Sequence, residues 1–333
     1  MSNRRDFLRK TLVGTAAISL PGALSNKALA TDFVNRDSAY GKPLPVSCLS
    51  YSFNGLVREG MMDVFGYFET CRYRYHLDAA DLWIGMIRQA ETDDDFVNKV
   101  HRALKERQLV IPNIACDGAH LIDATSRDTP EGRAALRVKQ DRWLKVSKQW
   151  GVGFLRCDAG PMPGNGTPAD NAPWSQENFD YLVKRYREMA QFAYDNGFKV
   201  GAENHQGQEK YWPNMEKLIK AIDHPGFGIC VDFRQWYSTS EATKLQEDDV
   251  ADRGALPYIC HTHFKWDIIE NTELFLSKMK MLYNGGYKGY YSAEHNSRVN
   301  EYNLTLVQIT KIRSVLKNLV DGGAGEFIAP RES

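Results

Sequence analysis

From residue 45 onward, the chain alternates short apolar runs with longer amphipathic segments. The short runs are rich in Val, Ile, Tyr and Cys and are at most nine residues long. Such runs are typical of parallel strands that are buried on both faces. We predict eight of them, at residues 45–53, 77–83, 109–117, 153–160, 199–205, 227–233, 257–265 and 290–297.

The segments between these runs have apolar residues at the spacing of a helix. The expected helices cover residues 93–108, 133–150, 175–196, 275–283 and 303–319. The clearest is 175–196, where Phe179, Leu182 and Tyr186 are three or four residues apart. Ser175 is a favourable helix start, and Asn196 followed by Gly197 is a favourable helix stop.

Eight strands alternating with helices predict an α/β fold of the (β/α)8 TIM barrel type. The alternative is a doubly wound open sheet, which usually carries a glycine-rich phosphate loop after its first strand. Here the first strand is followed by Asn54 and Gly55 without the G-x-G-x-x-G pattern. Because no linker divides residues 45–320, we predict a single barrel there, with an extended lead-in at 31–44 and a tail at 321–333.

Residues 1–30 have the features of a targeting segment. Arg4 and Arg5 stand before Asp6-Phe7-Leu8, a mild apolar run follows, and Ala28-Leu29-Ala30 fits a cleavage site. This order resembles a twin-arginine (Tat) signal peptide, which implies the twin-arginine export machinery as a partner and a periplasmic or otherwise exported protein. A basic N-terminal helix or a membrane anchor is the alternative. After processing, no stable membrane span is expected.

The charge balance changes when this segment is set aside. The whole chain has 42 basic and 42 acidic residues, but without residues 1–30 it has 37 basic and 41 acidic ones. A mildly acidic surface gives no electrostatic basis for binding nucleic acid or an anionic membrane. The six cysteines are scattered, so we interpret them as buried thiols and not as a disulfide framework.

Ionisable side chains stand at the ends of the last four predicted strands. Glu203, Asp232, His263 and Glu294 follow one another at intervals of 29, 31 and 31 residues. One βα unit of a barrel takes about 31 residues, so these four groups should meet at the carboxyl end of the barrel. Burying three carboxylates together is costly unless a cation offsets their charge. We therefore predict one divalent metal ion; this oxygen-rich set suits Mn²⁺, Mg²⁺ or Co²⁺ better than Zn²⁺, which also remains open.

The same segments carry a family resemblance. Gly201-Ala202-Glu203-Asn204-His205, Ile229-Cys230-Val231-Asp232, His261-Thr262-His263-Phe264-Lys265 and Ser292-Ala293-Glu294 together resemble the xylose isomerase-like barrel superfamily. The nearest branch looks like the sugar isomerase/epimerase and ketose 3-epimerase group. The resemblance covers residues 45–320 and is most specific in the C-terminal half.

The resemblance implies a function and a set of roles. It implies that Glu203, Asp232, His263 and Glu294 hold the metal, and that Glu203 and Glu294 are also the catalytic pair. The expected enzyme is an exported, metal-dependent sugar isomerase or epimerase acting on a small carbohydrate. A proton leaves the carbon next to a carbonyl, the resulting enediolate is stabilised, and a proton returns. A lyase or hydratase that eliminates a group from a keto-glycoside is the close alternative.

Five further residues are candidate substrate contacts. They are His205, His261, Arg156, Lys265 and Arg234. His261 competes with His263 for the metal because side chains two residues apart in a strand face the same way, and the resemblance favours His263. His205 could instead hydrogen-bond a carboxylate. Ketose epimerases often have a His three residues after the Asp, where this chain has Gln235; this argues against a free-ketose 3-epimerase.

Two other functions are compatible with a barrel of this kind. An apurinic-site endonuclease shares the barrel, but it typically uses three zinc ions, more metal-binding His and a basic surface, whereas this chain has eight His and an acidic mature part. A non-catalytic sugar-binding barrel would be favoured by loss of a ligand, yet all four positions are filled. The oligomeric state stays open, a homo-oligomer included.

Overall fold

The computed structural model describes residues 44–116, 129–158, 171–240, 242–323 and 325. The predicted signal peptide at 1–30 lies outside the described residues, as do most of the lead-in at 31–44 and most of the tail at 321–333. These boundaries and the export of the protein therefore stay predictions.

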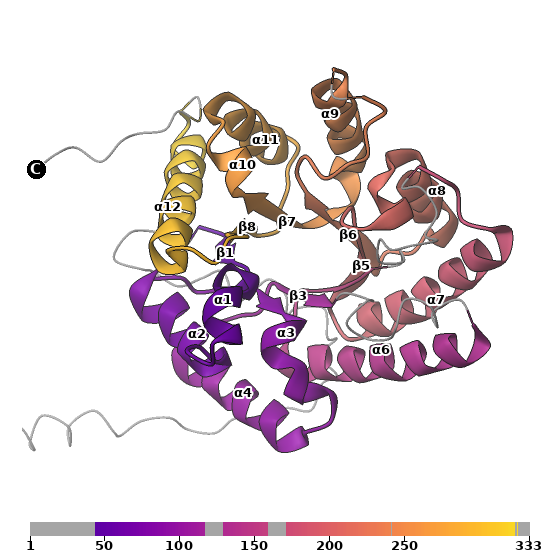
Figure 1. The fold of residues 1–333 in the computed structure, drawn as a ribbon, viewed down its shortest axis with the longest axis horizontal. Helices are drawn as coiled ribbons and strands as arrows, with labels where there is room; N and C mark the ends of the chain where they lie inside the picture. Colours follow the sequence, from indigo (N-terminus) through magenta and orange to yellow (C-terminus); the bar gives the residue numbers. More distant parts are fainter. Residues whose placement is uncertain (1–43, 117–128, 159–170, 241, 324, 326–333) are drawn as a thin grey trace, which may run out of the picture.

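Eight parallel strands form the centre of the molecule (Figure 1). They are β1 (Val46–Cys48), β2 (Leu82–Trp83), β3 (Asn113–Cys116), β4 (Phe154–Cys157), β5 (Lys199–Glu203), β6 (Phe227–Asp232), β7 (Ile259–Lys265) and β8 (Tyr291–Glu294). Each lies inside one of the eight predicted runs. The order β1-β8-β7-β6-β5-β4-β3-β2 is that of a barrel in which each strand pairs with its neighbours in the sequence.

The first and second strands meet through a short contact that closes the ring. Leu49 and Asp81 form an isolated parallel bridge just beyond β1 and just before β2. The Asp81 amide donates to the Cys48 carbonyl at 3.2 Å, and the Ser50 amide donates to the Asp81 carbonyl at 2.9 Å. The predicted (β/α)8 barrel is confirmed, and the open doubly wound sheet is excluded.

Helices surround the strands. The longer ones are α4 (Asp94–Arg107), α6 (Pro130–Trp150), α7 (Gln176–Asp195), α8 (Trp212–Ile222), α9 (Lys244–Ala255), α11 (Thr272–Asn284) and α12 (Glu301–Val320). Short ones are α1 (Asn54–Arg58), α2 (Val64–Glu69), α3 (Ile84–Ile87) and α10 (Trp266–Ile269). The five predicted helices correspond to α4, α6, α7, α11 and α12, whereas α8 and α9 were not predicted.

Side-chain caps fix where several of these helices begin. Asp93, Thr129 and Ser175 each accept a hydrogen bond from a backbone amide in the first turn of α4, α6 and α7. A cap satisfies amides that have no partner within the helix. Gly151 ends α6 in the left-handed conformation that glycine adopts without strain.

The core lies between the strands and the surrounding helices. Strand residues that alternate with the cavity-facing ones, among them Leu155, Val200 and Ile229, point toward the helices and are fully buried. All six cysteines are free; five are buried, and Cys260 is partly so. In the part of the chain that the structure describes, no helix is both long and apolar enough to cross a membrane.

Candidate active site

A cavity of about 400 Å³ opens at the carboxyl ends of the strands. Its lining residues come from both halves of the barrel. They are Leu49, Tyr51, Arg58, Trp83, Ala115, Arg156, Glu203, His205, Gln206, Asp232, Lys265, Glu294 and Asn296. The strand-end carboxylates of β5, β6 and β8 therefore face one common space, as their spacing predicts.

Glu203 ends β5 and is fully buried. Its Oε2 accepts a hydrogen bond from the Arg156 guanidinium of β4. Its Oε1 lies 2.8 Å from His263 Nδ1 and 3.5 Å from the Cys230 thiol. The carboxylate of Glu203 is thus held between a cation on one side and an imidazole on the other.

Asp232 ends β6 and pairs with the Lys265 ammonium, which follows on β7. Asn204 fixes its backbone, because the Asn204 amide donates to the Asp232 carbonyl at 2.9 Å and accepts from its N–H at 2.8 Å. Burial raises the pKa of Asp232 although the charge of Lys265 opposes this. Its Oδ1 is buried and has no hydrogen-bond partner in the structure. An unpaired buried carboxylate oxygen is costly unless a ligand meets it.

Glu294 ends β8, and its Oε2 lies 3.6 Å from His263 Nδ1. Burial alone would raise the pKa of Glu294, but the positive charges of Lys265 and His263 outweigh it and lower the pKa. Glu294 is therefore ionised at neutral pH. His263 Nδ1 is the atom that Glu203 and Glu294 share.

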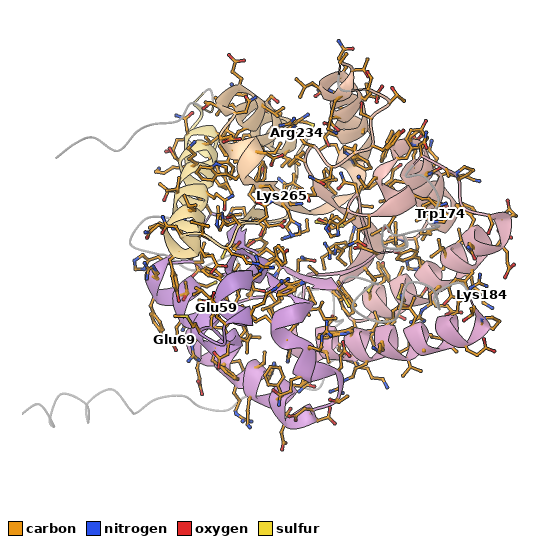
Figure 2. All side chains as sticks on the ribbon, viewed as in Figure 1. Glu59, Glu69, Trp174, Lys184, Arg234 and Lys265 are labelled. Atoms are coloured by element: carbon orange, nitrogen blue, oxygen red, sulfur yellow. The ribbon has the colours of Figure 1, made fainter. Side chains whose placement is uncertain are left out.

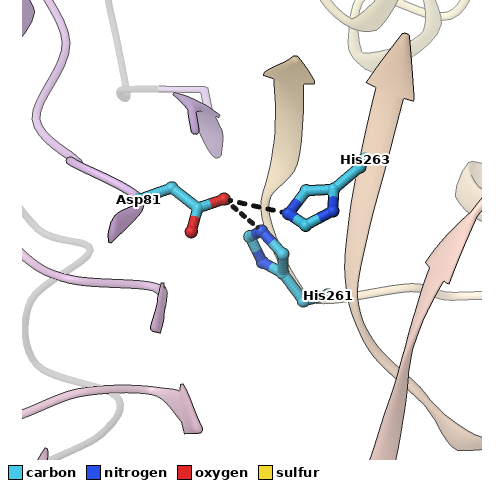
Figure 3. Close-up of side chains that lie close together, drawn as sticks. All are labelled: Asp81, His261 and His263. Carbon is cyan, nitrogen blue, oxygen red and sulfur yellow. Dashed lines mark hydrogen bonds and ion pairs between the residues drawn. The ribbon is translucent and has the colours of Figure 1, made fainter. Parts of the chain in front are cut away.

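Asp81 lies behind the two histidines of β7 (Figure 3). Its Oδ2 is 2.6 Å from His261 Nε2 and 3.4 Å from His263 Nε2, and it also accepts from the Ser292 hydroxyl at 2.7 Å. Asn113 donates to the other oxygen at 2.8 Å. The carboxylate thereby sets the orientation of both rings and leaves His263 Nδ1 directed at Glu203 and Glu294.

The remaining predicted contacts fall into two groups. Arg156, His205 and Lys265 line the cavity. His205 Nδ1 is also 3.4 Å from Asp158, so its hydrogen bond to a carboxylate is present, while contact with substrate stays a prediction. His261 is fully buried against Asp81 and does not line the cavity. Arg234 has a left-handed backbone (φ 67°), does not line the cavity either, and lies farther from the centre than Lys265 (Figure 2).

Several cavity residues were not among the predicted ones. The polar side chains of this group include Tyr51, Arg58, Gln206 and Asn296. Tyr51 packs edge-on against Trp83, with ring centroids 5.0 Å apart. Gln206 and Asn296 each stand two or three residues beyond a predicted ligand. Their position just after a strand end is the sequence feature from which they could have been predicted. Arg58 lies in α1, where no periodic pattern marks it.

Three groups of potential metal ligands lie within 4.8 Å of one another among the described residues. They are Asp81–His261–His263, Glu203–Cys230–His263 and Asp158–Glu203–His205. Glu203 and His263 each occur in two of them. The predicted set of Glu203, Asp232, His263 and Glu294 is not one of these groups. In the structure Arg156 pairs with Glu203, and Lys265 pairs with Asp232. The donor set nevertheless fits a hard divalent cation. Three carboxylates line one cavity, and His263 Nδ1 lies 2.8 Å from Glu203 and 3.6 Å from Glu294.

Residues 74–306 match the family model of the xylose isomerase-like TIM barrel. The chain therefore belongs to this family, as the strand-end motifs indicated. No curated protein matches the chain.

Solved structures of the same fold are similar over most of the chain. D-psicose 3-epimerase with D-tagatose, from Clostridium cellulolyticum H10, is 13% identical with a TM-score of 0.62, and the match covers 82% of this chain and 99% of that one. A xylose isomerase-like TIM barrel protein from Mycobacterium smegmatis in complex with magnesium is 15% identical (TM-score 0.60; 82% and 97%). The probable 3-DHS dehydratase AsbF from Bacillus anthracis is 16% identical (TM-score 0.55; 83% and 99%). At these identities the similarity shows the fold alone.

Proposed function

We propose that the protein is a divalent-metal-dependent sugar isomerase or epimerase that moves a proton next to a carbonyl. The observation that carries this proposal is that Glu203 and Glu294 line one cavity and both approach His263 Nδ1, at 2.8 and 3.6 Å. Two ionisable carboxylates at one space are what a reaction needs when a proton is removed and another is returned. The similarity to an epimerase structure supports the same class.

Glu203, Asp232, His263 and Glu294 would hold the cation. When bound, it would supply Lewis acidity toward the carbonyl oxygen and the neighbouring hydroxyl of the sugar. The unpaired Asp232 Oδ1 and the complex of a family member with magnesium both support such a site. Mn²⁺, Mg²⁺ and Co²⁺ suit the ligands best, and Zn²⁺ is a further candidate.

The cavity side chains have different roles in the proposed reaction. Glu294, kept ionised by the positive charges around it, takes the proton from carbon, and Glu203 returns one, or the two act in the reverse order. Arg156 and Lys265 bind and orient the sugar oxygens. The Tyr51 and Trp83 rings give the cavity an apolar wall against which a sugar face can pack.

A lyase is the second candidate, favoured by the similarity to the probable dehydratase structure. Proton removal next to a carbonyl is the first step of both reactions. If a leaving group stands on the next carbon, elimination follows; otherwise the proton returns and the product is an epimer or isomer.

The test uses Glu203→Gln and Glu294→Gln with ketoses, keto-glycosides and their acidic counterparts in D2O. We expect each variant to lose at least about 100-fold in the rate of deuterium incorporation at carbon, the usual value of a positioned acid or base. Glu216→Gln is the matched control, because Glu216 is on α8 and pairs with Lys220 at the surface, away from the cavity lining.

Folding of each variant is checked by circular dichroism. Full exchange in both site variants would exclude the two-glutamate mechanism. Loss of mass from the substrate, with an unsaturated product, would assign the lyase instead.

A further inference from the structure

We propose that Glu203, Cys230 and His263 form a second metal site, which contains a thiolate and takes Zn²⁺ or a softer divalent ion. This site shares Glu203 and His263 with the hard-cation site of the proposed function, so only one of the two sites can be filled at a time. The mutual exclusion rests on the proposed function, whereas the thiolate site itself rests on the distances between three buried side chains.

Cys230 stands two residues before Asp232 on β6, so both side chains face the inside of the barrel. Asp232 lines the cavity, whereas Cys230 is fully buried and is not among the lining residues. The Cys230 Sγ is 3.5 Å from Glu203 Oε1 and 3.8 Å from His263 Nδ1. Those two atoms are themselves 2.8 Å apart. A sulfur, an oxygen and a nitrogen therefore converge on one point.

The three distances match the spacing of ligands around a tetrahedral ion. Zn²⁺ binds sulfur at about 2.3 Å and nitrogen or oxygen at about 2.0–2.2 Å, so its ligand atoms stand about 3.3–3.6 Å apart. The two distances from Cys230 are close to this spacing. The shorter contact between His263 and Glu203 holds a proton that the ion replaces. The thiol also gives up its proton to solvent when it binds the ion.

An ion can bind at this site without breaking the buried ion pairs. Arg156 holds Glu203 through Oε2, whereas Oε1 is the atom that faces Cys230 and His263. The ion pair of Asp232 also stays intact, because Asp232 is not a ligand of this site. One carboxylate and one thiolate offset the two positive charges of the ion, so its burial leaves no excess charge.

Asp81 and Glu294 support the same position of the ion. Asp81 Oδ2 lies 3.4 Å from His263 Nε2, the ring nitrogen that does not face the site (Figure 3). A carboxylate in this position orients a metal-binding imidazole. Glu294 Oε2 lies 3.6 Å from His263 Nδ1 and can supply the fourth ligand. The ion can enter through the cavity, which Glu203 and Glu294 both line.

The sulfur decides which ion the site selects. Thiolates favour Zn²⁺ and softer ions, whereas carboxylates suit Mg²⁺ and Mn²⁺. Replacing two carboxylates of the hard-cation site by Cys230 therefore shifts the preference toward Zn²⁺. A Zn²⁺ ion at this site would displace Mn²⁺ and would also occupy Glu203, one of the two groups proposed to carry the proton.

The test uses the full chain and measures the metal directly. Co²⁺ serves as an optical probe in place of Zn²⁺, and we expect the near-ultraviolet absorption band of a Co²⁺–thiolate bond. X-ray absorption of the Zn²⁺-loaded protein should show a sulfur neighbour at about 2.3 Å. Addition of Zn²⁺ should release bound Mn²⁺, which is followed by the electron paramagnetic resonance signal of the free ion.

Cys230→Ser should lose the Co²⁺ band and the sulfur neighbour. Its affinity for Zn²⁺ relative to Mn²⁺ should fall at least about tenfold, because oxygen replaces the soft ligand. Cys260→Ser is the matched control and should keep both signals, since Cys260 faces the other side of β7 from His263, where its thiol contacts the Tyr258 carbonyl at 3.6 Å. Circular dichroism checks that each variant is folded, and the measurements on the unaltered protein need no variant.

A Zn²⁺ ion without a sulfur neighbour in the unaltered protein overturns the inference, and so does a Co²⁺ band that persists in Cys230→Ser. Simultaneous binding of Zn²⁺ and Mn²⁺ overturns the sharing of ligands. The deuterium exchange described above separates these outcomes from the proposed function. If sulfur binds Zn²⁺ but no sugar exchanges a proton in the Mn²⁺-loaded protein, the proposed reaction fails and the thiolate site stands. If the Mn²⁺-loaded protein exchanges and Zn²⁺ has no sulfur neighbour, the reaction stands and this inference fails.

Discussion

At the scale of single residues, basic side chains of the protein compensate the negative charges of two site carboxylates. Glu203 faces Arg156, and Asp232 faces Lys265, in pairs that are almost completely buried. Removing one partner of such a pair leaves an uncompensated charge in the interior. Substitution of Arg156 or Lys265 therefore tests folding as well as binding.

Asp81 provides a prediction about metal affinity. Asp81→Asn keeps the shape of the side chain but removes the charge that orients His261 and His263. We expect the affinity for Mn²⁺ to fall about 10- to 100-fold, the usual effect of removing a carboxylate behind a metal-binding histidine. The measurement is competition against a fluorescent chelator, which does not depend on activity.

Asp78→Asn is the matched control, since Asp78 lies nearby in the sequence but is half exposed and pairs with Arg72. Its Mn²⁺ affinity should equal that of the unaltered protein. If Asp81→Asn binds Mn²⁺ equally well, Asp81 does not position the metal site.

The sequence identified the strand-end residues better than the others for a physical reason. Glu203, Asp232 and Glu294 break apolar runs at the repeat length of a βα unit, and all three line the cavity. Arg58 carries no such signal because it stands in a short helix. Asp81 stands inside the second predicted strand without a marked spacing, and only the fold shows that it meets His261, 180 positions away.

At the scale of elements, the contact between β5 and β6 depends on glycine. A Cβ on Gly201 would stand 1.7 Å from the Gly228 carbonyl oxygen, which is backbone and cannot move aside. We expect Gly201→Ala to destabilise the protein by about 1–3 kcal/mol, the usual cost of overpacking. The free energy of unfolding is measured in urea.

Gly66→Ala is the control, because a Cβ there meets only Asp63 at an ordinary 3.5 Å and the position is helical. It should be neutral or slightly stabilising. A Gly201→Ala variant as stable as Gly66→Ala would show that the two strands can separate locally without cost.

The helix α9 buries a carboxyl group and predicts a pH dependence. Burial raises the pKa of Asp248 to about 6, although Lys244 lies 3.4 Å away. The unfolded chain has a pKa near 3.9 for this group, so the folded state binds the proton more tightly. Between about pH 4 and pH 6 the stability therefore falls as pH rises.

The Asp248→Asn variant has no carboxyl group to ionise at this position, so its stability should not fall in this way as pH rises. We expect its free energy of unfolding, relative to the unaltered protein, to rise by about 1–3 kcal/mol from pH 4 to pH 7. Asp249→Asn should not show this rise, because Arg253 lowers the pKa of that exposed carboxyl. A flat difference for Asp248→Asn would mean that Asp248 is not desolvated.

The same helix shows where sequence patterns fail. The residues of α9 that are buried include Asp248 and Asp252, and Asp252 pairs with Lys278 at 2.8 Å. A helix that buries charged side chains lacks the apolar stripe by which an amphipathic helix is predicted from sequence. By contrast α7 buries Phe179, Tyr186 and Met189, and its boundaries were predicted to within one residue.

At the scale of the whole molecule, metal binding should be visible as stability. An ion that binds only the folded protein at about 100 times its dissociation constant adds about 2.7 kcal/mol. For a barrel of this size we expect Mn²⁺ to raise the melting temperature by about 5 °C or more. Excess EDTA should remove the gain.

Glu294→Gln should show a much smaller increase, whereas Glu216→Gln should behave like the unaltered protein. An equal increase in all three proteins would place the bound ion elsewhere. Absence of any increase in the unaltered protein would argue against a resident cation.

The closure of the ring by Leu49 and Asp81 has a consequence for the order in which the molecule is assembled. The Asp81 backbone joins the first strand to the second, while its side chain reaches His261 across 180 residues of sequence. Contacts between such distant segments form late, since the intervening chain must already be arranged. A folding intermediate still open at this seam has no fixed His263. We therefore expect the barrel to gain its affinity for the cation in its last folding step, so that metal uptake reports completion of the fold.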